Sequence, residues 1–500
     1  MSNIEEKHST LETIISQRKE KIKQIKELGV NPFSYNYSVT HKNNEILENY
    51  DKFENKEVAI AGRLMAIRKM GKASFANVTD STGKIQLYIS KKDIGEDKYK
   101  LFKILDIGDF VGCKGIVMKT RTGEITVKVL ELELLSKNIR PLPIVKEKDG
   151  VLHDTFSDKE QRYRKRYLDL ILNPDVKGTF VKRTKIIAAT RKFFDEKGYL
   201  EVETPILQPI YGGANARPFE TYHNTLGMNL FLRIADELYL KRLIIGGFDK
   251  VYEICKNFRN EGMDKSHNPE FSMIEFYEAY VDFNYMMDLV EEYFKNIAKT
   301  LGSLEIEYDG NKIDFNKPFQ RISMFKLFEK YLEVDISDYG KEELIPLCEE
   351  KNFEFDPKWN YGQFIDALFG EFVEKHLIQP TFVTDFPKEI SPLAKTRRDG
   401  NEKLVERFEL FIGKEEYVNS FSELTDPIDQ RKRLESQAKL RDQGDKEAQI
   451  VDEDFLQALE YGMPPTGGVG IGLDRVIMLF TGQTSIKDVL FFPQMKKENE

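Results

Sequence analysis

The sequence predicts an α+β protein made of a small all-β barrel followed by a larger mixed domain. Five short segments of alternating apolar and polar residues recur between residues 57 and 136, which is the pattern of strands in a small barrel. Two prolines and a charged run at residues 146–150 then mark a boundary. Beyond it, apolar residues at helical spacing over residues 182–198 lead directly into a strand-like alternation at residues 200–203. A chain of 500 residues is long enough for two or three domains.

The first thirty residues form a predicted amphipathic helix. An apolar stripe runs along one side, lysines and arginines crowd the other, and Gly29 ends the helix. A basic helical face is more often solvated than bound to RNA, but here it precedes a predicted nucleic-acid-binding module. The stripe consists of Leu11, Ile14, Ile15, Ile22, Ile25 and Leu28.

The barrel region contains five predicted strands separated by turn sequences. Five such strands are typical of an OB-fold, whose exposed face binds single-stranded nucleic acid by stacking bases on aromatic side chains. From its spacing alone, Phe75 is expected in the barrel core, and the basic run at residues 69–72 is interpreted as a hairpin turn. The strands are predicted at residues 58–61, 73–78, 85–89, 115–118 and 125–129.

The net charge of −9 is distributed unevenly along the chain. Residues 1–150 carry 27 lysines and arginines against 21 acidic residues, whereas the remainder carries 48 against 63. Because contacts to phosphate supply much of the affinity for RNA, a basic N-terminal part on an acidic body is compatible with a nucleic-acid partner. Ordinary scatter of charge is the alternative explanation.

Composition also limits which cellular compartment and which kinds of metal site are expected. The sequence has no apolar run typical of a secretory signal or a membrane span, which predicts a cytoplasmic protein without a membrane partner. The cysteines are few, odd in number and far apart, so they support neither a disulfide framework nor a zinc cluster. We expect all three to be buried: Cys113, Cys255 and Cys348.

Two segments far apart in the sequence have features expected of a nucleotide-binding site. Glycines recur over residues 467–472, just before Arg475, and such glycines weaken a strand unless something must approach its backbone closely. Arg259 lies in the run Phe258-Arg259-Asn260-Glu261. An arginine is a permanently charged, planar partner for a phosphate or a base. The glycine spacing is not that of a P-loop.

These two segments resemble motifs 3 and 2 of class II aminoacyl-tRNA synthetases, and residues 182–205 resemble motif 1, which makes the dimer interface in that family. The resemblance covers nearly the whole chain. It implies a mainly antiparallel sheet of six to seven strands with flanking helices, carrying a helical insertion at about residues 295–400. The implied domains are an N-terminal helix with an OB-fold anticodon-binding domain (1–145), a linker (146–160) and a class II catalytic domain (161–500).

Such enzymes activate an amino acid by attack of its carboxylate on the α-phosphate of ATP, which requires positioning and charge neutralisation rather than a protein nucleophile. The resemblance makes Arg259 the bridge between the α-phosphate and the substrate carboxylate, and Arg475 the arginine that lies over the adenine. Phe271 is implied to stack on the other adenine face. The remaining implied ATP contacts are Glu261, His267, Asn268 and Glu409.

Magnesium is the implied cofactor, because it prefers oxygen ligands and retains several waters. Glu409 and Glu416 resemble the metal-bridging acids of the family and lie seven residues apart across a predicted hairpin. The motif 2 loop departs from the family, since Ser266 stands where an arginine is usual. Lys265 offers a point charge there but lacks the planar, two-pronged geometry of arginine. We therefore expect weaker contacts to the outer phosphates of ATP.

The barrel is similar to the anticodon-binding domain of the class IIb enzymes, which charge lysine, aspartate and asparagine. On that resemblance, Phe75 stacks on an anticodon base, while Arg68, Gln86 and Glu124 read base edges.

The charge of the side-chain pocket indicates which amino acid is used. A lysine ammonium removed from water needs carboxylate partners, whereas an aspartate side chain needs a cation. The acids of this chain match the lysine pocket of lysyl-tRNA synthetases, and Gly213 is implied to pass its backbone beside the substrate amino group. The implied lysine contacts are Gly213, Glu237, Arg259, Glu275, Tyr277, Asn419 and Glu423.

The resulting hypothesis is a homodimeric enzyme that activates L-lysine with ATP and transfers it to the 3′-end of tRNA(Lys). An aspartyl or asparaginyl enzyme of the same class would need a cationic pocket instead. A non-catalytic tRNA-binding relative would not be expected to retain both arginines and both metal-bridging acids. An enzyme that transfers lysine onto a protein is a further alternative, but relatives of that type lack the barrel. Ornithine, one methylene shorter than lysine, is the hardest competitor to reject.

Overall fold

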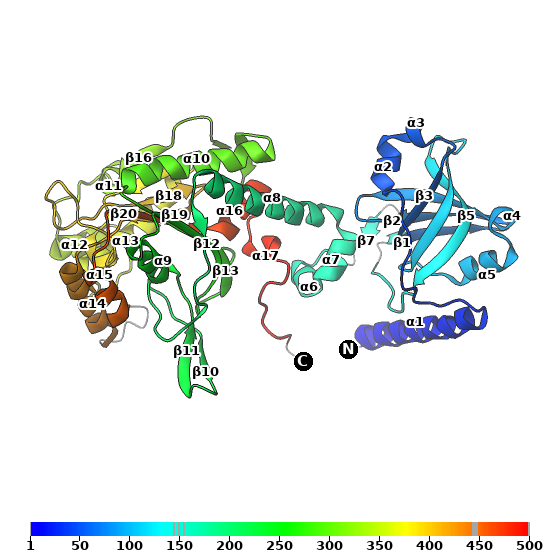
Figure 1. Cartoon of the computed structure of the whole chain (residues 1–500), viewed down its shortest axis with the longest axis horizontal. Helices are drawn as coiled ribbons and strands as arrows, with labels where there is room; N and C mark the ends of the chain where they lie inside the picture. Colours follow the sequence, from blue (N-terminus) through cyan, green and yellow to red (C-terminus); the bar gives the residue numbers. More distant parts are fainter. Residues whose placement is uncertain (1, 144–145, 149–150, 154–155, 443–448, 499–500) are drawn as a thin grey trace. The chain divides into compact units, whose positions relative to one another are not determined.

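The chain divides into two compact units, each with its own core (Figure 1). The computed structural model describes residues 2–143, 146–148, 151–153, 156–442 and 449–498. Unit 1 is Met1–Ser157 and unit 2 is Asp158–Glu500. In the predicted linker, residues 149–150 and 154–155 lie outside the described residues. The described part pairs as two short antiparallel strands, β6 (Lys146–Lys148) and β7 (Val151–His153).

Unit 1 is a closed barrel of five strands in the order β1-β2-β3-β5-β4, which confirms the predicted OB-fold. The N-terminal helix α1 (Ser2–Glu27) ends before Gly29, whose φ of 73° is the left-handed conformation that glycine adopts at low cost. Four short helices complete the unit: α2 (Asn43–Glu48), α3 (Tyr50–Phe53), α4 (Lys91–Ile94) and α5 (Glu96–Ile104). The strands are β1 (Glu57–Met70), β2 (Ala73–Thr79), β3 (Lys84–Ser90), β4 (Phe110–Lys119) and β5 (Ile125–Ser136).

The expectation that Phe75 lies in the barrel core is wrong. Side chains alternate across a strand, and Ser74, Ala76 and Val78 of β2 are the ones that point inward and are buried. Phe75 is therefore on the outer face and only half-buried. The basic run at residues 69–72 forms the turn between β1 and β2, as predicted, with Gly71 at a φ of 56°.

Unit 2 is built on an eight-stranded sheet in the order β16-β17-β18-β19-β20-β13-β12-β8. It is antiparallel except for the two outer pairs, β16 with β17 and β12 with β8. The predicted count of six to seven strands is too low because the edge strands are short, and β8 has only two residues. The strands are β8 (Leu200–Glu201), β12 (Lys250–Phe258), β13 (Glu270–Ala279), β16 (Gln320–Ser323), β17 (Thr381–Thr384), β18 (Arg407–Ile412), β19 (Glu415–Ser422) and β20 (Thr466–Gly472).

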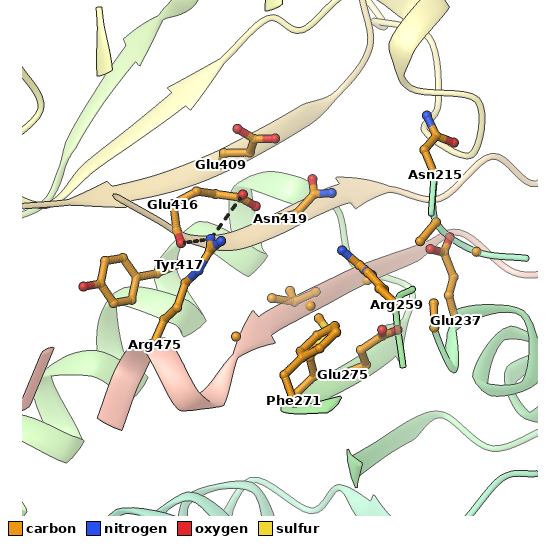
Figure 2. A pocket seen from close by; sticks show the side chains of 18 of the residues that line it. Asn215, Glu237, Arg259, Phe271, Glu275, Glu409, Glu416, Tyr417, Asn419 and Arg475 are labelled. Atoms are coloured by element: carbon orange, nitrogen blue, oxygen red, sulfur yellow. Dashed lines mark hydrogen bonds and ion pairs between the residues drawn. The ribbon is translucent and has the colours of Figure 1, made fainter. Parts of the chain in front are cut away.

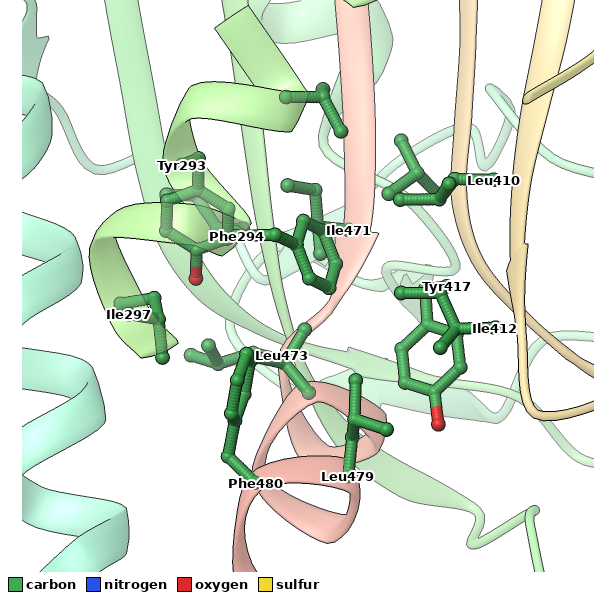
Figure 3. Packing of buried hydrophobic residues seen from close by; sticks show 14 of the residues in the cluster. Tyr293, Phe294, Ile297, Leu410, Ile412, Tyr417, Ile471, Leu473, Leu479 and Phe480 are labelled. Carbon is green, nitrogen blue, oxygen red and sulfur yellow. The ribbon is translucent and has the colours of Figure 1, made fainter. Parts of the chain in front are cut away.

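One face of this sheet carries the main apolar core, to which helices α8 (Pro174–Glu196), α10 (Phe283–Leu301) and α16 (Leu473–Thr481) contribute (Figure 3). The ring of Phe294 on α10 meets the ring of Tyr417 on β19 edge-on, with centroids 6.2 Å apart. It also lies 6.4 Å from the ring of Phe480 on α16. Burial of each large apolar side chain contributes about 1.5–3 kcal/mol, so this face is a rigid backing for the sheet. The opposite face carries smaller apolar clusters and the polar groups described below.

Three helices are inserted between the neighbouring strands β16 and β17 and have an apolar cluster of their own. They are α11 (Met324–Leu332), α12 (Lys341–Glu350) and α13 (Tyr361–Phe372). The helical part is thus narrower than the predicted insertion at about residues 295–400. That range begins within α10, and β16 and β17 inside it belong to the central sheet.

The remaining elements surround the sheet. Helix α9 (Glu237–Ile245) packs against β12 and β13 and carries residues of the site described below. The three cysteines are buried and free, as expected. In the described parts of the chain, no helix combines the length and apolar character needed to cross a membrane. The other elements are α6 (Lys159–Arg164), α7 (Arg166–Leu172), β9 (Leu207–Gln208), β10 (Glu220–His223), β11 (Met228–Leu232), β14 (Glu305–Tyr308), β15 (Asn311–Asp314), α14 (Pro427–Asp442), α15 (Glu453–Glu460) and α17 (Ile486–Val489).

Candidate active site

A cavity of about 410 Å³ opens on the face of the sheet opposite to the aromatic core. Because side chains alternate along β13, Ile274 and Phe276 enter the core while Glu275 and Tyr277 face the cavity. The structure brings nearly all the residues predicted for ATP, lysine and metal to this one place. They are Gly213, Glu237, Arg259, Glu261, His267, Asn268, Phe271, Glu275, Tyr277, Glu409, Glu416, Asn419 and Arg475.

The cavity has two chemically different ends. Figure 2 shows Arg475, Glu409 and Glu416 at one end and Glu237 at the other, with Arg259 between them. Arg259 directly follows β12, and its Cζ lies 5.2 Å from the centre of the Phe271 ring. Its Nε is buried without a hydrogen-bond partner among the described residues, and burial lowers the pKa of Arg259. A buried cation in this state favours an anion beside it, such as a phosphate or a carboxylate.

Arg475, at the start of α16, reaches across to β19 and to the loop between β12 and β13. Its Nη1 donates a hydrogen bond to the backbone carbonyl of Glu416 (2.6 Å) and lies 3.6 Å from the carboxylate of the same residue. Its Nη2 lies 3.1 Å from Nε2 of His267. These contacts hold a planar guanidinium at the edge of the cavity, where it can stack on a base or meet a phosphate.

Glu409 on β18 and Glu416 on β19 belong to the two strands of one hairpin, as predicted. Burial and the charge of Glu416 raise the pKa of Glu409 to about 8, although Arg407 donates a hydrogen bond to it (2.5 Å). A hard cation such as magnesium fits this pair of carboxylates. No cluster of three or more metal-ligating side chains occurs among the residues described. Phosphate and water oxygens would therefore complete the coordination.

The loop between β12 and β13 contains the departure noted at Ser266. The Ser266 hydroxyl lies 3.3 Å from a carboxylate oxygen of Glu415, and His267 pairs with Asp264 (2.8 Å). The side chain of Lys265 is exposed to solvent. The loop thus presents an exposed point charge next to the position where the family usually has arginine.

The other end of the cavity is acidic. The Tyr277 hydroxyl donates a hydrogen bond to Glu275 (3.2 Å), and burial together with the nearby carboxyl of Asp236 raises the pKa of Glu275. Gly213 adopts a φ of 85°, and a Cβ at this position would lie 3.1 Å from Cβ of Glu237. A cation placed beside these crowded, buried acids would favour their ionised forms, so this end of the cavity suits a positively charged group.

Glu423 is the one predicted lysine contact that does not line the cavity itself. It lies directly against Gly468, where a Cβ would come within 2.0 Å of Glu423 Oε1. That oxygen is buried and has no hydrogen-bond partner in the described chain. The other carboxylate oxygen pairs with Lys241, which is fully buried and also contacts Glu237.

Sequence reasoning missed two cations of the site. Lys241 follows Glu237 at the i,i+4 spacing of a helical ion pair, so the signal was present in the sequence. Arg407 donates hydrogen bonds to Asn419 (3.0 Å) and to Glu409, and it therefore links the two ends of the cavity. Glu409 lies two residues further along the same strand, on the same face as Arg407, whereas Asn419 meets Arg407 only through strand register.

The residues predicted to read an anticodon belong to unit 1, on the outer face of the barrel. Arg68, Phe75, Tyr88 and Lys128 are register partners on four successive strands and so form one row across that face. Tyr88, whose ring is 5.4 Å from that of Phe75, was missed although it sits on the same side of β3 as Gln86. The Thr126 hydroxyl donates a hydrogen bond to Gln86 (2.8 Å), and Glu124 is exposed at the start of β5. Two adjacent aromatic rings among cations suit stacked bases.

Comparison with known proteins agrees with this geometry. Residues 158–496 match the family of tRNA synthetases class II (D, K and N), and residues 58–135 match an OB-fold nucleic acid binding domain. A lysine–tRNA ligase of Porphyromonas gingivalis is 51% identical over 96% of this chain and 85% of its own length. Those of Christiangramia forsetii (52%; 97% and 86%) and Carboxydothermus hydrogenoformans (50%; 98% and 99%) are equally similar. The chain belongs to the class II tRNA synthetases of the D, K and N group.

Proposed function

We propose that this protein is a lysine–tRNA ligase, which activates L-lysine with ATP to lysyl-adenylate and transfers it to the 3′-end of tRNA(Lys). The observation that carries the proposal is a single cavity with Arg475 at one end, buried acids at the other and Arg259 between them. Such a site accommodates a nucleotide beside an amino acid whose side chain ends in a cation. The names of the relatives, which are about half identical over nearly the whole chain, agree with it.

In the proposed reaction Arg259 holds the α-phosphate against the lysine carboxylate, and its unpaired Nε supports that role. Phe271 and Arg475 enclose the adenine, and Glu261, His267 and Asn268 line the ATP site. Because the chemistry is an in-line displacement, the contribution of these residues is orientation and compensation of charge. Magnesium held by Glu409 and Glu416 supplies further neutralisation of phosphate charge when ATP is bound.

The tRNA is proposed to contact the outer face of the barrel. Phe75 and Tyr88 offer stacking surfaces, and Arg68, Gln86 and Glu124 offer hydrogen bonds to base edges. Two features support this assignment: the adjacent rings of Phe75 and Tyr88, and the cations Arg68 and Lys128 at the two ends of the same row.

We further propose a homodimer that works in the cytoplasm. Exposed apolar side chains in and beside the motif 1 region support the dimer, because a subunit interface there would cover them. Leu200 on β8 is 46% exposed, and Val181, which directly precedes the region on α8, is 55% exposed.

The same-class alternative is an aspartyl or asparaginyl enzyme, which needs a cation for the substrate side chain. Lys241 is a cation at this end of the cavity, but it is already paired with Glu237 and Glu423. The nearby carboxyls of Asp236 and Glu275 leave the surroundings acidic. The arrangement therefore favours lysine.

The decisive experiment is amino-acid-dependent ATP–pyrophosphate exchange in magnesium, with lysine, ornithine, aspartate and asparagine as separate substrates. Exchange with lysine alone is expected. Exchange with aspartate or asparagine would contradict the acidic-pocket argument. Absence of exchange with every substrate, from folded protein, would favour a non-catalytic tRNA-binding role.

A further inference from the structure

We propose that Lys241 is a positioning residue for amino-acid selection, a built-in counter-cation that holds Glu237 and Glu423 and leaves one Glu423 oxygen for the substrate ammonium. The inference rests on the proposed lysine-activating function and deepens it. It concerns a residue that lies outside the cavity and touches neither ATP nor the reacting carboxylate.

Lys241 is completely buried beside the acidic end of the cavity. Its Nζ donates to Oε1 of Glu237 (2.5 Å) and forms an ion pair with Oε2 of Glu423. The rings of Phe421 and Phe455 flank the same ammonium, with centroids at 5.4 and 5.9 Å. A buried ammonium is tolerated only with such partners, because desolvation of an unpaired charge costs several kcal/mol.

A purely structural ion pair would satisfy both of its members, and this one does not. Oε1 of Glu423 is buried without a partner in the part of the chain described, and it lies against the bare Cα of Gly468, which lines the cavity. Glu237 lines the cavity directly. When both carboxylates are ionised, the single ammonium of Lys241 leaves one negative charge in excess, and a ligand with a single terminal ammonium compensates it.

Further charged groups lie close to Glu237 and Lys241, and most of them are acidic. Glu237 is also faced by Asp236 at the start of its own helix and by Arg407 from β18. The carboxyl of Glu275 and the hydroxyl of Tyr277 face the group from β13.

Titration of the two acids depends on Lys241. Burial raises the pKa of Glu423 to about 8, and Lys241 opposes that rise. Burial lowers the pKa of Lys241, but Glu237 and Glu423 outweigh it, so the pKa is raised and the ammonium stays charged. Without this ammonium both acids would hold protons to higher pH and would bind lysine poorly near neutrality.

The test measures the KM for lysine and for ATP by pyrophosphate exchange between pH 6 and 9. The proteins are the unsubstituted chain, Lys241→Met and Lys295→Met. The control removes a lysine from another i,i+4 pair, Glu291–Lys295 on α10 (2.7 Å), which does not line the cavity. Lys241→Met is expected to raise the KM for lysine about tenfold or more at pH 7, and to move the pH dependence of that KM upward by about one unit. The KM for ATP should change less than about twofold, and the control should match the unsubstituted protein.

The outcomes separate the two proposals. If the unsubstituted protein shows no lysine-dependent exchange, the proposed function fails. If it shows exchange but Lys241→Met keeps the lysine KM and its pH dependence, or raises both KM values equally, Lys241 is merely structural and the inference is overturned. If Lys241→Met does not fold, Lys241→Arg replaces it. Retention of the charge should keep the pH dependence in place while the altered geometry raises the lysine KM, and a shifted pH dependence or an unchanged KM would overturn the inference.

Discussion

Replacement of Gly468 by alanine tests whether the Glu423 carboxylate, which lies against this glycine, recognises the lysine substrate. Gly468 pairs with Tyr277 on β13 and Phe421 on β19, in the middle of three strands. The added Cβ would lie 2.0 Å from Glu423 Oε1 and 2.4 Å from Cε1 of Tyr277. Ordinary contact distances are about 3.5 Å, so the carboxylate and the ring must each move by about 1–1.5 Å.

Displacements of about 1–1.5 Å in a packed site have typical costs in stability and in activity. Overpacking a well-packed position costs about 1–3 kcal/mol, and a misplacement of about 1 Å in a site can cost about a hundredfold. We therefore expect Gly468→Ala to raise the KM for lysine about 10- to 100-fold, which corresponds to about 1.4–2.7 kcal/mol. The KM for ATP should change much less, because the nucleotide end of the cavity does not depend on Glu423.

The assay is lysine-dependent pyrophosphate exchange with each substrate varied in turn. Gly178→Ala is the matched control, since Gly178 lies in helix α8 with nothing within 4 Å of its added Cβ. It should leave both KM values unchanged. An unchanged lysine KM in Gly468→Ala, with the protein folded, would refute the role assigned to Glu423 beside this glycine.

Three further predictions follow from the same contacts. The KM for lysine in exchange should fall as pH rises from 6 to 8, because the pKa of Glu423 is raised to about 8 and only the ionised acid attracts an ammonium; a KM that rises with pH would contradict this. Phe75→Ala should impair charging of tRNA while sparing exchange, and loss of both would place Phe75 in a folding role. Arg166→Met should lower stability by about 3–5 kcal/mol in urea unfolding followed by circular dichroism, because Arg166 is fully buried and pairs with Asp169 (2.6 Å); a loss under about 1 kcal/mol would show that this pair is dispensable.

The elements with strong local patterns could be predicted from the sequence. The five barrel strands and the helix that ends at Gly29 follow from alternation, helical spacing and a glycine with positive φ. Arg259 and Arg475 could be selected because each stands in a short local motif. Their meeting in one cavity was implied by resemblance, and nothing in their spacing required it.

The errors in the predicted fold share one cause, which is that the deciding partner is distant in sequence. The strands β8 and β16 are too short to show a period, and they exist because a neighbouring strand pairs with them. Phe75 lies outside the barrel because the register of β2 turns its neighbours inward.

The sequence by itself determined the class of this protein, its two-part organisation and most of the chemical groups that line the cavity. The two-part organisation follows from short-range periodicity, whereas the class and the cavity groups follow from the resemblance that local motifs carry. Only the tertiary structure decided that Glu423 lies against Gly468, that Lys241 neutralises part of the acidic pocket and that Arg407 links the two ends of the cavity. The reason is physical, because burial, strand register and the compensation of buried charge are properties of the packed chain.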